Sequence, residues 1–189
     1  MCSNPLMITT IRPARLEDVP GIAKVHVDSW RTTYKGLIAD EFLAALSYEG
    51  RAQIWKKDLS DPENNSILYV AETRPDGIVG FVSAGPARSD DQYYQGELYA
   101  IYLLQQAQSQ GIGRKMVNIA MRELSKRGFS SMLLWVLKDN LPSRKFYEAV
   151  GGEYLREKPI EIGSQDLIEV AYGWKNLGIY PKVKKEFTF

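Results

Sequence analysis

The sequence predicts a single domain of the α/β (α+β) class, in which helices flank a mixed β-sheet. Three observations lead to this prediction. Runs of strand and helix type follow one another in the order βααβββαβαββ, no repeat or low-complexity linker interrupts the 189 residues, and the run 130–137 is almost continuously apolar. A strand of that last kind is usually buried on both faces, so helices are expected on both sides of the sheet.

The first expected elements are a strand and two helices. Residues 7–14 alternate apolar and polar side chains as a half-buried strand does. Residues 16–30 carry apolar side chains at helical spacing, and Pro20 is tolerated because it falls near the start of the helix. The apolar residues of 41–59 predict a second helical stretch, with a break near Gly50.

A hairpin and a third strand follow. The β-rich runs 66–73 and 78–87 flank a short Pro-Asp-Gly turn, which is typical of a β-hairpin. Residues 96–104 form the next β-rich run. The three runs are expected to pair in one sheet.

Two helices and three strands complete the fold. A glycine turn leads into a stretch with a mainly apolar stripe that ends near Gly128, and the apolar strand 130–137 follows it. Residues 140–152 predict a short helix with Asn140 as its N-cap and Gly151 as its stop. The last strand-like runs are 153–162 and 167–174.

Composition limits the class of function. With 44% hydrophobic and 25% charged residues the chain is typical of a soluble globular protein, expected in the cytoplasm with no membrane partner. No apolar run approaches the roughly 18 residues that a membrane helix needs. The net charge of +1 and the absence of a basic block argue against a nucleic-acid partner. One domain is expected over 1–189, with a C-terminal tail at 176–189.

Few residues are available for metal binding or nucleophilic catalysis. Cys2 is the only cysteine and His26 the only histidine, which excludes a cysteine-cluster metal site, and no metal is expected. A metal-dependent hydrolase or a Ser-His-Asp triad would depend entirely on His26. Proton transfer is therefore expected from carboxylates and tyrosines.

The segment 108–113, Gln-Ser-Gln-Gly-Ile-Gly, indicates an anion site. Glycines let the backbone approach a ligand, and the amides at a helix N-terminus attract an anion. The segment is not a P-loop, because Gly113 is not followed by Lys-Ser/Thr. It is not a dinucleotide fingerprint either, because Met116 stands where the third glycine would be. A plain glycine turn between a strand and a helix remains the alternative.

Two segments carry a family resemblance. The glycine turn with its flanking strand and helix resembles the acetyl-CoA-binding core of the GNAT superfamily of N-acetyltransferases. The stretch from Asn140 to Gly151 is similar to the family's Asn-(x)6-Tyr-Glu-x-x-Gly segment, although Gly152 replaces a phenylalanine that is common there. The resemblance implies a GNAT fold in which two splayed parallel strands bind CoA, with acetyl-CoA as co-substrate.

The resemblance also implies how CoA is held. The pantetheine arm would follow backbone groups of a strand that a β-bulge pushes away from its neighbour, and the pyrophosphate would lie on amides of the glycine turn. Asn140 would bind the arm through its amide, with a plain helix N-cap as the alternative. The expected cofactor-binding residues are Ile101, Tyr102, Leu103, Ser109, Gln110, Gly111, Ile112, Gly113, Arg114, Asn140 and Tyr147.

Two residues are expected to be catalytic by the same resemblance. Tyr147 would protonate the departing CoA thiolate, and the alternative is a tyrosine of the core. Glu97 would accept a proton from the acceptor amine. At pH 7 an alkylamine is mostly protonated, and reaching the nucleophilic free base costs roughly 4–5 kcal/mol. The alternative for Glu97 is an ordinary carboxylate at a strand end. The amine would attack directly in a ternary complex, with an amide of the bulged strand stabilising the oxyanion.

The acceptor is expected to be a primary amine of a small molecule or a peptide. His26, Trp30 and Tyr34 recur at every fourth position and would share a helix face. Trp30, Arg31 and Tyr34 are therefore candidates for the acceptor wall, with packing in the core as the alternative. A non-catalytic sensor of acyl-CoA is the alternative function, and a homodimer is left open.

Overall fold

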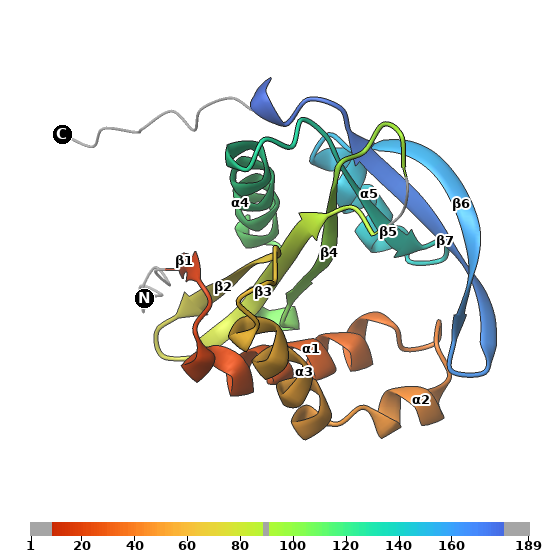
Figure 1. Cartoon of the computed structure of the whole chain (residues 1–189). Helices are drawn as coiled ribbons and strands as arrows, with labels where there is room; N and C mark the ends of the chain where they lie inside the picture. Colours follow the sequence, from red (N-terminus) through yellow and green to blue (C-terminus); the bar gives the residue numbers. More distant parts are fainter. Residues whose placement is uncertain (1–8, 89–90, 180–189) are drawn as a thin grey trace, which may run out of the picture.

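The computed structural model describes residues 9–88 and 91–179, which form one mixed sheet with helices on both faces (Figure 1). The strands are β1 (Thr9–Pro13), β2 (Ile67–Thr73), β3 (Gly77–Pro86), β4 (Gly96–Leu103), β5 (Met132–Leu137), β6 (Glu153–Ile162) and β7 (Gln165–Trp174). The helices are α1 (Val19–Thr33), α2 (Asp40–Ala45), α3 (Tyr48–Ser60), α4 (Ile112–Lys126) and α5 (Leu141–Ala149).

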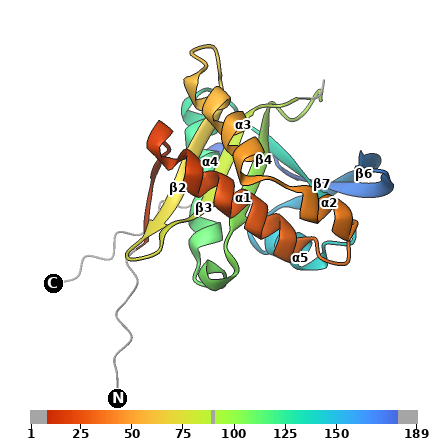
Figure 2. The same ribbon diagram turned by 90° about the horizontal axis from the view of Figure 1, so that it is seen from below.

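The described strands are ordered β1-β2-β3-β4-β5-β7-β6, and only β4 and β5 run parallel. Helices α1 and α3 lie side by side on one face of the sheet, as Figure 2 shows, and α4 covers the other face. Each face has its own apolar core. The larger one joins α4 and α5 to the sheet, and the smaller one joins α1 and α3 to it. The predicted α/β class with a mixed sheet is confirmed.

The helical stretch expected at 41–59 is divided into α2 and α3, and the break lies at Leu46 and Ser47 instead of Gly50. Ser47 has an extended backbone, and its hydroxyl accepts a hydrogen bond from the Gly50 amide at 3.2 Å. The prediction of a break at Gly50 was therefore wrong. A serine N-cap starts the new helix and places the glycine in its first turn.

The expectations for the two ends of the chain fall only in part on described residues. Residues 7 and 8 of the expected first strand lie outside the described residues, as do 180–189 of the expected tail. The start of that tail packs on the domain, because Leu177 is buried in the larger core and its amide donates to the Ser130 carbonyl at 2.9 Å.

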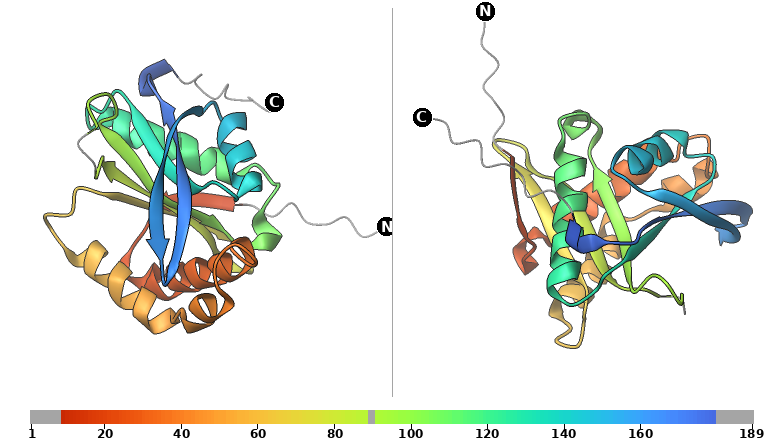
Figure 3. Two further views of the ribbon diagram at one scale, coloured as in Figure 1. Left: turned by 90° about the vertical axis from the view of Figure 1, so that its right-hand side faces the viewer. Right: turned by 90° about the horizontal axis from the view of Figure 1, so that it is seen from above.

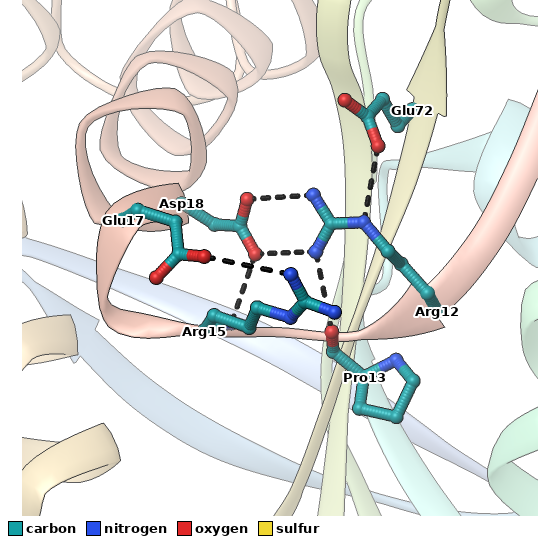
Figure 4. Close-up of polar contacts among 6 residues, drawn as sticks. All are labelled: Arg12, Pro13, Arg15, Glu17, Asp18 and Glu72. Atoms are coloured by element: carbon teal, nitrogen blue, oxygen red, sulfur yellow. Dashed lines mark hydrogen bonds and ion pairs between the residues drawn. The ribbon is translucent and has the colours of Figure 1, made fainter.

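Arg12, at the end of β1, fastens the first strand to the start of α1 (Figure 4). Its guanidinium donates to both carboxylate oxygens of Asp18, at 2.7 and 2.8 Å, and to Glu72 on β2 at 3.0 Å. The hydrogen bonds from Arg12 lower the pKa of Asp18, so this buried carboxylate stays ionised. Strands β2 and β3 separate the network from β4, and its role is to hold the edge of the sheet.

A β-bulge in β4 opens the sheet. Opposite β3, Ser83 pairs with Ala100 and Ala84 pairs with Leu98, which leaves Tyr99 as the extra residue. On its other side β4 pairs with β5 only through Gly96 and Glu97, and the two strands then separate. The splayed parallel strands and the bulge expected from the family resemblance are thus present.

A contact between the β6–β7 hairpin and the α1–α2 connection joins the elements on either side of the gap between β4 and β5. The β6–β7 hairpin reaches the connection between α1 and α2 (Figure 3). There the Ala39 amide donates to Gln165 Oε1 at 2.5 Å, and Phe42 covers Gly163 so closely that a Cβ on this glycine would lie 2.8 Å from the ring. A third apolar cluster, which includes Ile38, surrounds the contact.

Candidate active site

A cleft of about 1240 Å³ lies between the separated strands. Strand β4 lines it with residues 98–103 and β5 with 134–136, and the turn before α4 adds residues within 105–114. Residues within 31–37, at the end of α1, and within 139–147, at the start of α5, complete the lining. The cleft therefore has one wall of strand backbone, one end at a helix N-terminus and another end against α1.

The turn before α4 presents backbone donors to the cleft. Two residues of it, Ser109 and Gly111, have left-handed backbones, with φ of 60° and 76°. In the described residues no hydrogen bond uses the six consecutive amides from Ser109 to Arg114. These amides lie at the positive end of the α4 dipole, so the turn is a preformed cradle for an anion.

The two glycines of the turn have different tasks. Gly111 supplies the left-handed backbone, which costs a residue with a side chain roughly 1–2 kcal/mol. Gly113 allows close packing, because a Cβ there would lie 3.2 Å from the ring of Phe146 on α5. The side-chain amide of Gln108 donates through Nε2 to the Leu103 carbonyl at 3.1 Å and holds the turn to the end of β4.

The strand wall has one unpaired edge. Ile101, Tyr102 and Leu103 line the cleft and pair with β3 on one side. No described strand pairs with them on the side that faces β5. An extended ligand with amide groups could therefore bind here as an additional strand.

Asn140 fulfils the expected N-cap role and also lines the cleft. Its Oδ1 accepts the Ser143 amide at 3.2 Å, and the side chain is buried. The cap uses only the oxygen, and no described residue bonds the amide nitrogen. The two alternatives that the sequence left open are therefore compatible with each other.

Tyr147 lies on α5 and lines the cleft, although only 8% of its surface is exposed. Its ring packs against Phe146, with centroids 5.4 Å apart, and against Tyr172 at 6.3 Å. Burial raises the pKa of its hydroxyl well above the ordinary value. The group is thus protonated at neutral pH and available as a donor.

Glu97 is not brought together with Tyr147 in the cleft. Its carboxylate is buried and accepts three hydrogen bonds from Arg88: the backbone amide to Oε2 at 2.9 Å, Nε to Oε1 at 3.0 Å, and Nη2 to Oε1. It does not belong to the lining of the cleft. A carboxylate that is engaged in this way is poorly placed to accept a proton from an amine.

The three acceptor candidates divide into two groups. Arg31 and Tyr34 line the cleft, whereas Trp30 does not. Trp30 packs between neighbouring rings, 5.9 Å from His26 and 4.9 Å from Tyr34, as the spacing on one helix face predicted. The Arg31 guanidinium donates to the carbonyls of Leu43 at 3.2 Å and of Leu46 at 2.8 Å, so it also ties α1 to α2.

His26 lies beneath this part of the cleft and is held neutral. Its Nδ1 accepts the indole N–H of Trp55 at 3.1 Å, and its ring stacks on Tyr102 with centroids 5.2 Å apart. Burial, with a smaller contribution from the charge of Arg51, lowers the pKa of His26 to about 3. It is a packing residue of the smaller core.

Tyr99 and Trp135 are among the cleft residues that the sequence analysis did not predict. Tyr99 is the bulge residue and carries the Arg88 guanidinium 4.5 Å from its ring centroid. Trp135 lies on β5 and carries Lys158 at 4.0 Å and Arg156 at 5.4 Å. The signal for Trp135 was one large aromatic residue in an otherwise aliphatic strand. The bulge at Tyr99 leaves no comparable local signal.

No described helix is both long and apolar enough to span a bilayer. Within residues 9–88 and 91–179, no cluster of three or more His, Cys, Asp or Glu side chains is arranged to hold a metal ion.

Comparison with known proteins gives consistent matches. The model of the acetyltransferase (GNAT) family matches residues 27–151. The uncharacterized N-acetyltransferase YuaI of Bacillus subtilis is 43% identical over 170 residues, which cover 90% of this chain and 95% of that protein. A spermidine N(1)-acetyltransferase of Thermoplasma acidophilum is 22% identical over 165 residues, which cover 82% of this chain and 99% of that protein.

Solved structures share the fold. The PaiA N-acetyltransferase of Thermoplasma acidophilum, in complex with coenzyme A, superposes with a TM-score of 0.71 at 22% identity, over 89% of this chain and 99% of that one. The protein yncA of Salmonella typhimurium, solved with its cofactor acetyl-CoA, gives a TM-score of 0.64 at 18% identity, over 92% and 96% of the two chains.

Proposed function

The chain belongs to the GNAT family of acetyltransferases, and from this membership we propose how its cleft moves an acetyl group from acetyl-CoA to a primary amine. An acetyl-CoA-dependent acyltransferase needs a place for the cofactor's phosphates, a place for its arm and a donor for the leaving thiolate. The observation that carries the proposal is the row of six amides from Ser109 to Arg114 that no described residue engages, beside the edge of β4 that no described strand pairs with.

The pyrophosphate of acetyl-CoA would bind the amides of the glycine turn: those of Ser109, Gln110, Gly111, Ile112, Gly113 and Arg114. Six donors at one helix N-terminus match a group with several anionic oxygens. From there the pantetheine arm would run along Ile101, Tyr102 and Leu103 as an additional strand. The free amide nitrogen of Asn140 would bind a carbonyl of the arm.

Tyr147 would donate the proton that the thiolate takes as it leaves. Its place in the cleft and its raised pKa support this role, because a general acid must be protonated before the reaction. The amine would attack the thioester carbonyl directly, and an amide near the bulge would stabilise the oxyanion.

The base is assigned differently from the sequence-based expectation. Arg88 engages both oxygens of Glu97, and Glu97 lies outside the cleft lining. We therefore propose that water in the cleft takes the proton from the acceptor amine.

The acceptor would be a primary amine of a small molecule or a peptide, bound between the end of α1 and the separated strands. Tyr34, Tyr99 and Trp135 offer ring surface there for its carbon skeleton. One relative is named for a polyamine substrate, spermidine, which is an amine of the small-molecule kind.

The test is release of CoA from acetyl-CoA in the presence of a panel of amines. We expect release that depends on the amine and saturates with it. Thermal shifts with CoA and acetyl-CoA, but not with ATP, should accompany it. Tight binding of acetyl-CoA without release for any amine would favour a non-catalytic sensor, and a thermal shift with ATP alone would contradict the cofactor assignment.

A further inference from the structure

The acceptor end of the cleft is bounded by two aromatic residues at the same level of the sheet. Glu97 pairs with Leu133, and Tyr99 and Trp135 each follow two residues later, on strands that have begun to separate. Both line the cleft. Each carries cationic side chains on its ring, Arg88 on Tyr99 and Lys158 with Arg156 on Trp135. The three cations do not themselves line the cleft, so the rim of the acceptor end consists of two lining aromatic residues with cations stacked on them from outside the lining.

Arg88 differs from the other two cations in how firmly it is held. Its Nε and Nη2 donate to Glu97 Oε1, its own backbone amide donates to Oε2, and its guanidinium lies over the ring of Tyr99. Nevertheless its side chain is 64% exposed, and Nη1 has no hydrogen-bond partner among the described residues. Arg88 therefore presents an oriented, unused donor at the rim.

The burial of Glu97 requires an explanation. A buried carboxylate carries a large desolvation penalty unless it is paired, and among the described residues the partner of this one is Arg88. Acting as a base, Glu97 would have to take a proton while three donors already bind it. As an anchor, it fixes the guanidinium before any ligand arrives, which reduces the entropy lost on binding.

We propose that Arg88 binds a carboxylate of the acceptor, and that Glu97 is the residue that positions Arg88. The inference rests on the proposed function, since it specifies the acceptor of the same reaction. The acceptor is then an amine that also bears an anionic group. A guanidinium suits a carboxylate because its donors lie in one plane and can form charge-assisted hydrogen bonds.

The opposite rim supports an anionic acceptor over a polycationic one. Arg156 and Lys158 place two further positive charges on Trp135, and each is balanced by one carboxylate, Asp91 and Glu169 respectively. Because Asp91 and Glu169 are engaged by these cations, an ammonium group of a polyamine would meet carboxylates that are already paired. A carboxylate would meet donors there instead.

The experiment compares amino acids with their own carboxamides as acceptors, so that each pair differs only in the charged group. ω-Amino acids of increasing length and α-amino acids are assayed by CoA release, together with linear diamines. We expect kcat/KM of the native protein to favour the best amino acid over its carboxamide by roughly 10- to 100-fold, the value of one charge-assisted hydrogen bond. Turnover of carboxamides or diamines without that preference would overturn the inference and leave the proposed function standing.

Variants assign the preference to residues. Arg88→Met with Glu97→Met removes both charges, so that no unpaired carboxylate stays buried, and should bring the ratio close to one without changing the Kd of acetyl-CoA. Arg88→Lys keeps the ion pair, should fold in any case, and should lose most of the preference because it lacks the planar donor set. Arg122→Met, at a surface ion pair on α4, is the matched control and should keep the ratio.

Glu97→Gln separates positioning from base catalysis. If Glu97 positions Arg88, KM should rise for amino acids alone, and kcat and its pH profile should be retained. A loss of kcat that is equal for amino acids and carboxamides, with a changed acid limb of the pH profile, would identify Glu97 as the base and overturn its assignment as a positioning residue.

Discussion

The two ends of the cleft are built on opposite principles. At the glycine turn the protein offers backbone amides that no residue in the described ranges engages, and side chains contribute little. At the acceptor rim nearly every polar group is a side chain already paired with another, as in Arg88 with Glu97 and Lys158 with Glu169. The first end therefore depends on backbone geometry and the second on residue identity.

This difference indicates how specificity is divided. A backbone cradle tolerates changes of side chain as long as its dihedral angles are kept, which suits a cofactor shared by a whole family. A rim of paired side chains changes with each substitution, which suits an acceptor that differs between relatives. Substitutions should therefore separate cleanly into those that change cofactor binding and those that change acceptor use.

Tyr147→Phe, at the junction of the two ends, should have the largest effect. Without the hydroxyl the thiolate leaves unprotonated, so kcat should fall about 100-fold, within the range of general acid catalysis. The Kd of acetyl-CoA, measured by calorimetry, should stay nearly constant. Tyr172→Phe is the control, because Tyr172 packs near Tyr147 but does not line the cleft. An equal loss of kcat and affinity would make Tyr147 a structural residue.

Gly111→Asp should damage the cofactor end alone. The left-handed backbone is strained by any side chain, and a carboxylate repels the pyrophosphate, so the Kd of acetyl-CoA should rise roughly 30-fold. Gly128→Asp is matched to it, since Gly128 is also left-handed and lies after the other end of α4. Gly128→Asp should lose comparable stability and keep its affinity. Equal affinities of the two variants for acetyl-CoA would contradict the proposal that the pyrophosphate binds at the turn.

The free energy of unfolding should depend on pH because His26, in the core beside the acceptor end of the cleft, is held neutral. His26 has a folded-state pKa of about 3 against an ordinary 6.5, so between these values the unfolded chain binds a proton that the folded chain does not. The free energy of unfolding should therefore fall as the pH falls below 6.5, by about 1.4 kcal/mol between pH 7.5 and 5.5. Urea titrations at several pH values measure it.

His26→Gln supplies the control for that measurement. Glutamine keeps an acceptor for the Trp55 indole but does not titrate, so its stability should be flatter over the same range. An identical slope in both proteins would mean that another group is responsible.

Trp135→Leu should have the smallest effect and act only at the acceptor end. The loss of one aromatic contact is worth about 1 kcal/mol, so KM for the acceptor should rise about fivefold. The Kd of acetyl-CoA should not change. If both constants rise together, the two ends of the cleft are not independent.

The fold and the geometry of the glycine turn could be predicted because their signals are local. The glycine turn, its flanking strand and its helix occupy one continuous segment, and Asn140 and Tyr147 lie on one short helix. The break at Ser47 was missed because a glycine was preferred over a serine cap as the stop signal, although glycine was compatible with the first turn of the next helix.

The acceptor end could not be predicted in the same way. Trp135 meets Lys158 and Arg156 only because β5 and β6 lie on either side of β7. The partner of Glu97 depends on how the loop after β3 returns to β4, which residue types alone do not determine. The expected role of Glu97 came from the family resemblance, and a buried ion pair leaves no mark in the sequence that distinguishes it from a free carboxylate.

Strand pairing closes the gap between β4 and β5 at one end, and a contact between the α1–α2 connection and the β6–β7 hairpin links the elements on either side of it. Two residue pairs, at Gly96 and Glu97, join the strands at one end, and the contact of Ala39 with Gln165 ties the far ends of the two halves. The two contacts together should fix the separation of the strands on either side of the gap. A ligand that enters it need not move the walls apart, so its binding should stiffen the strands more than it displaces them.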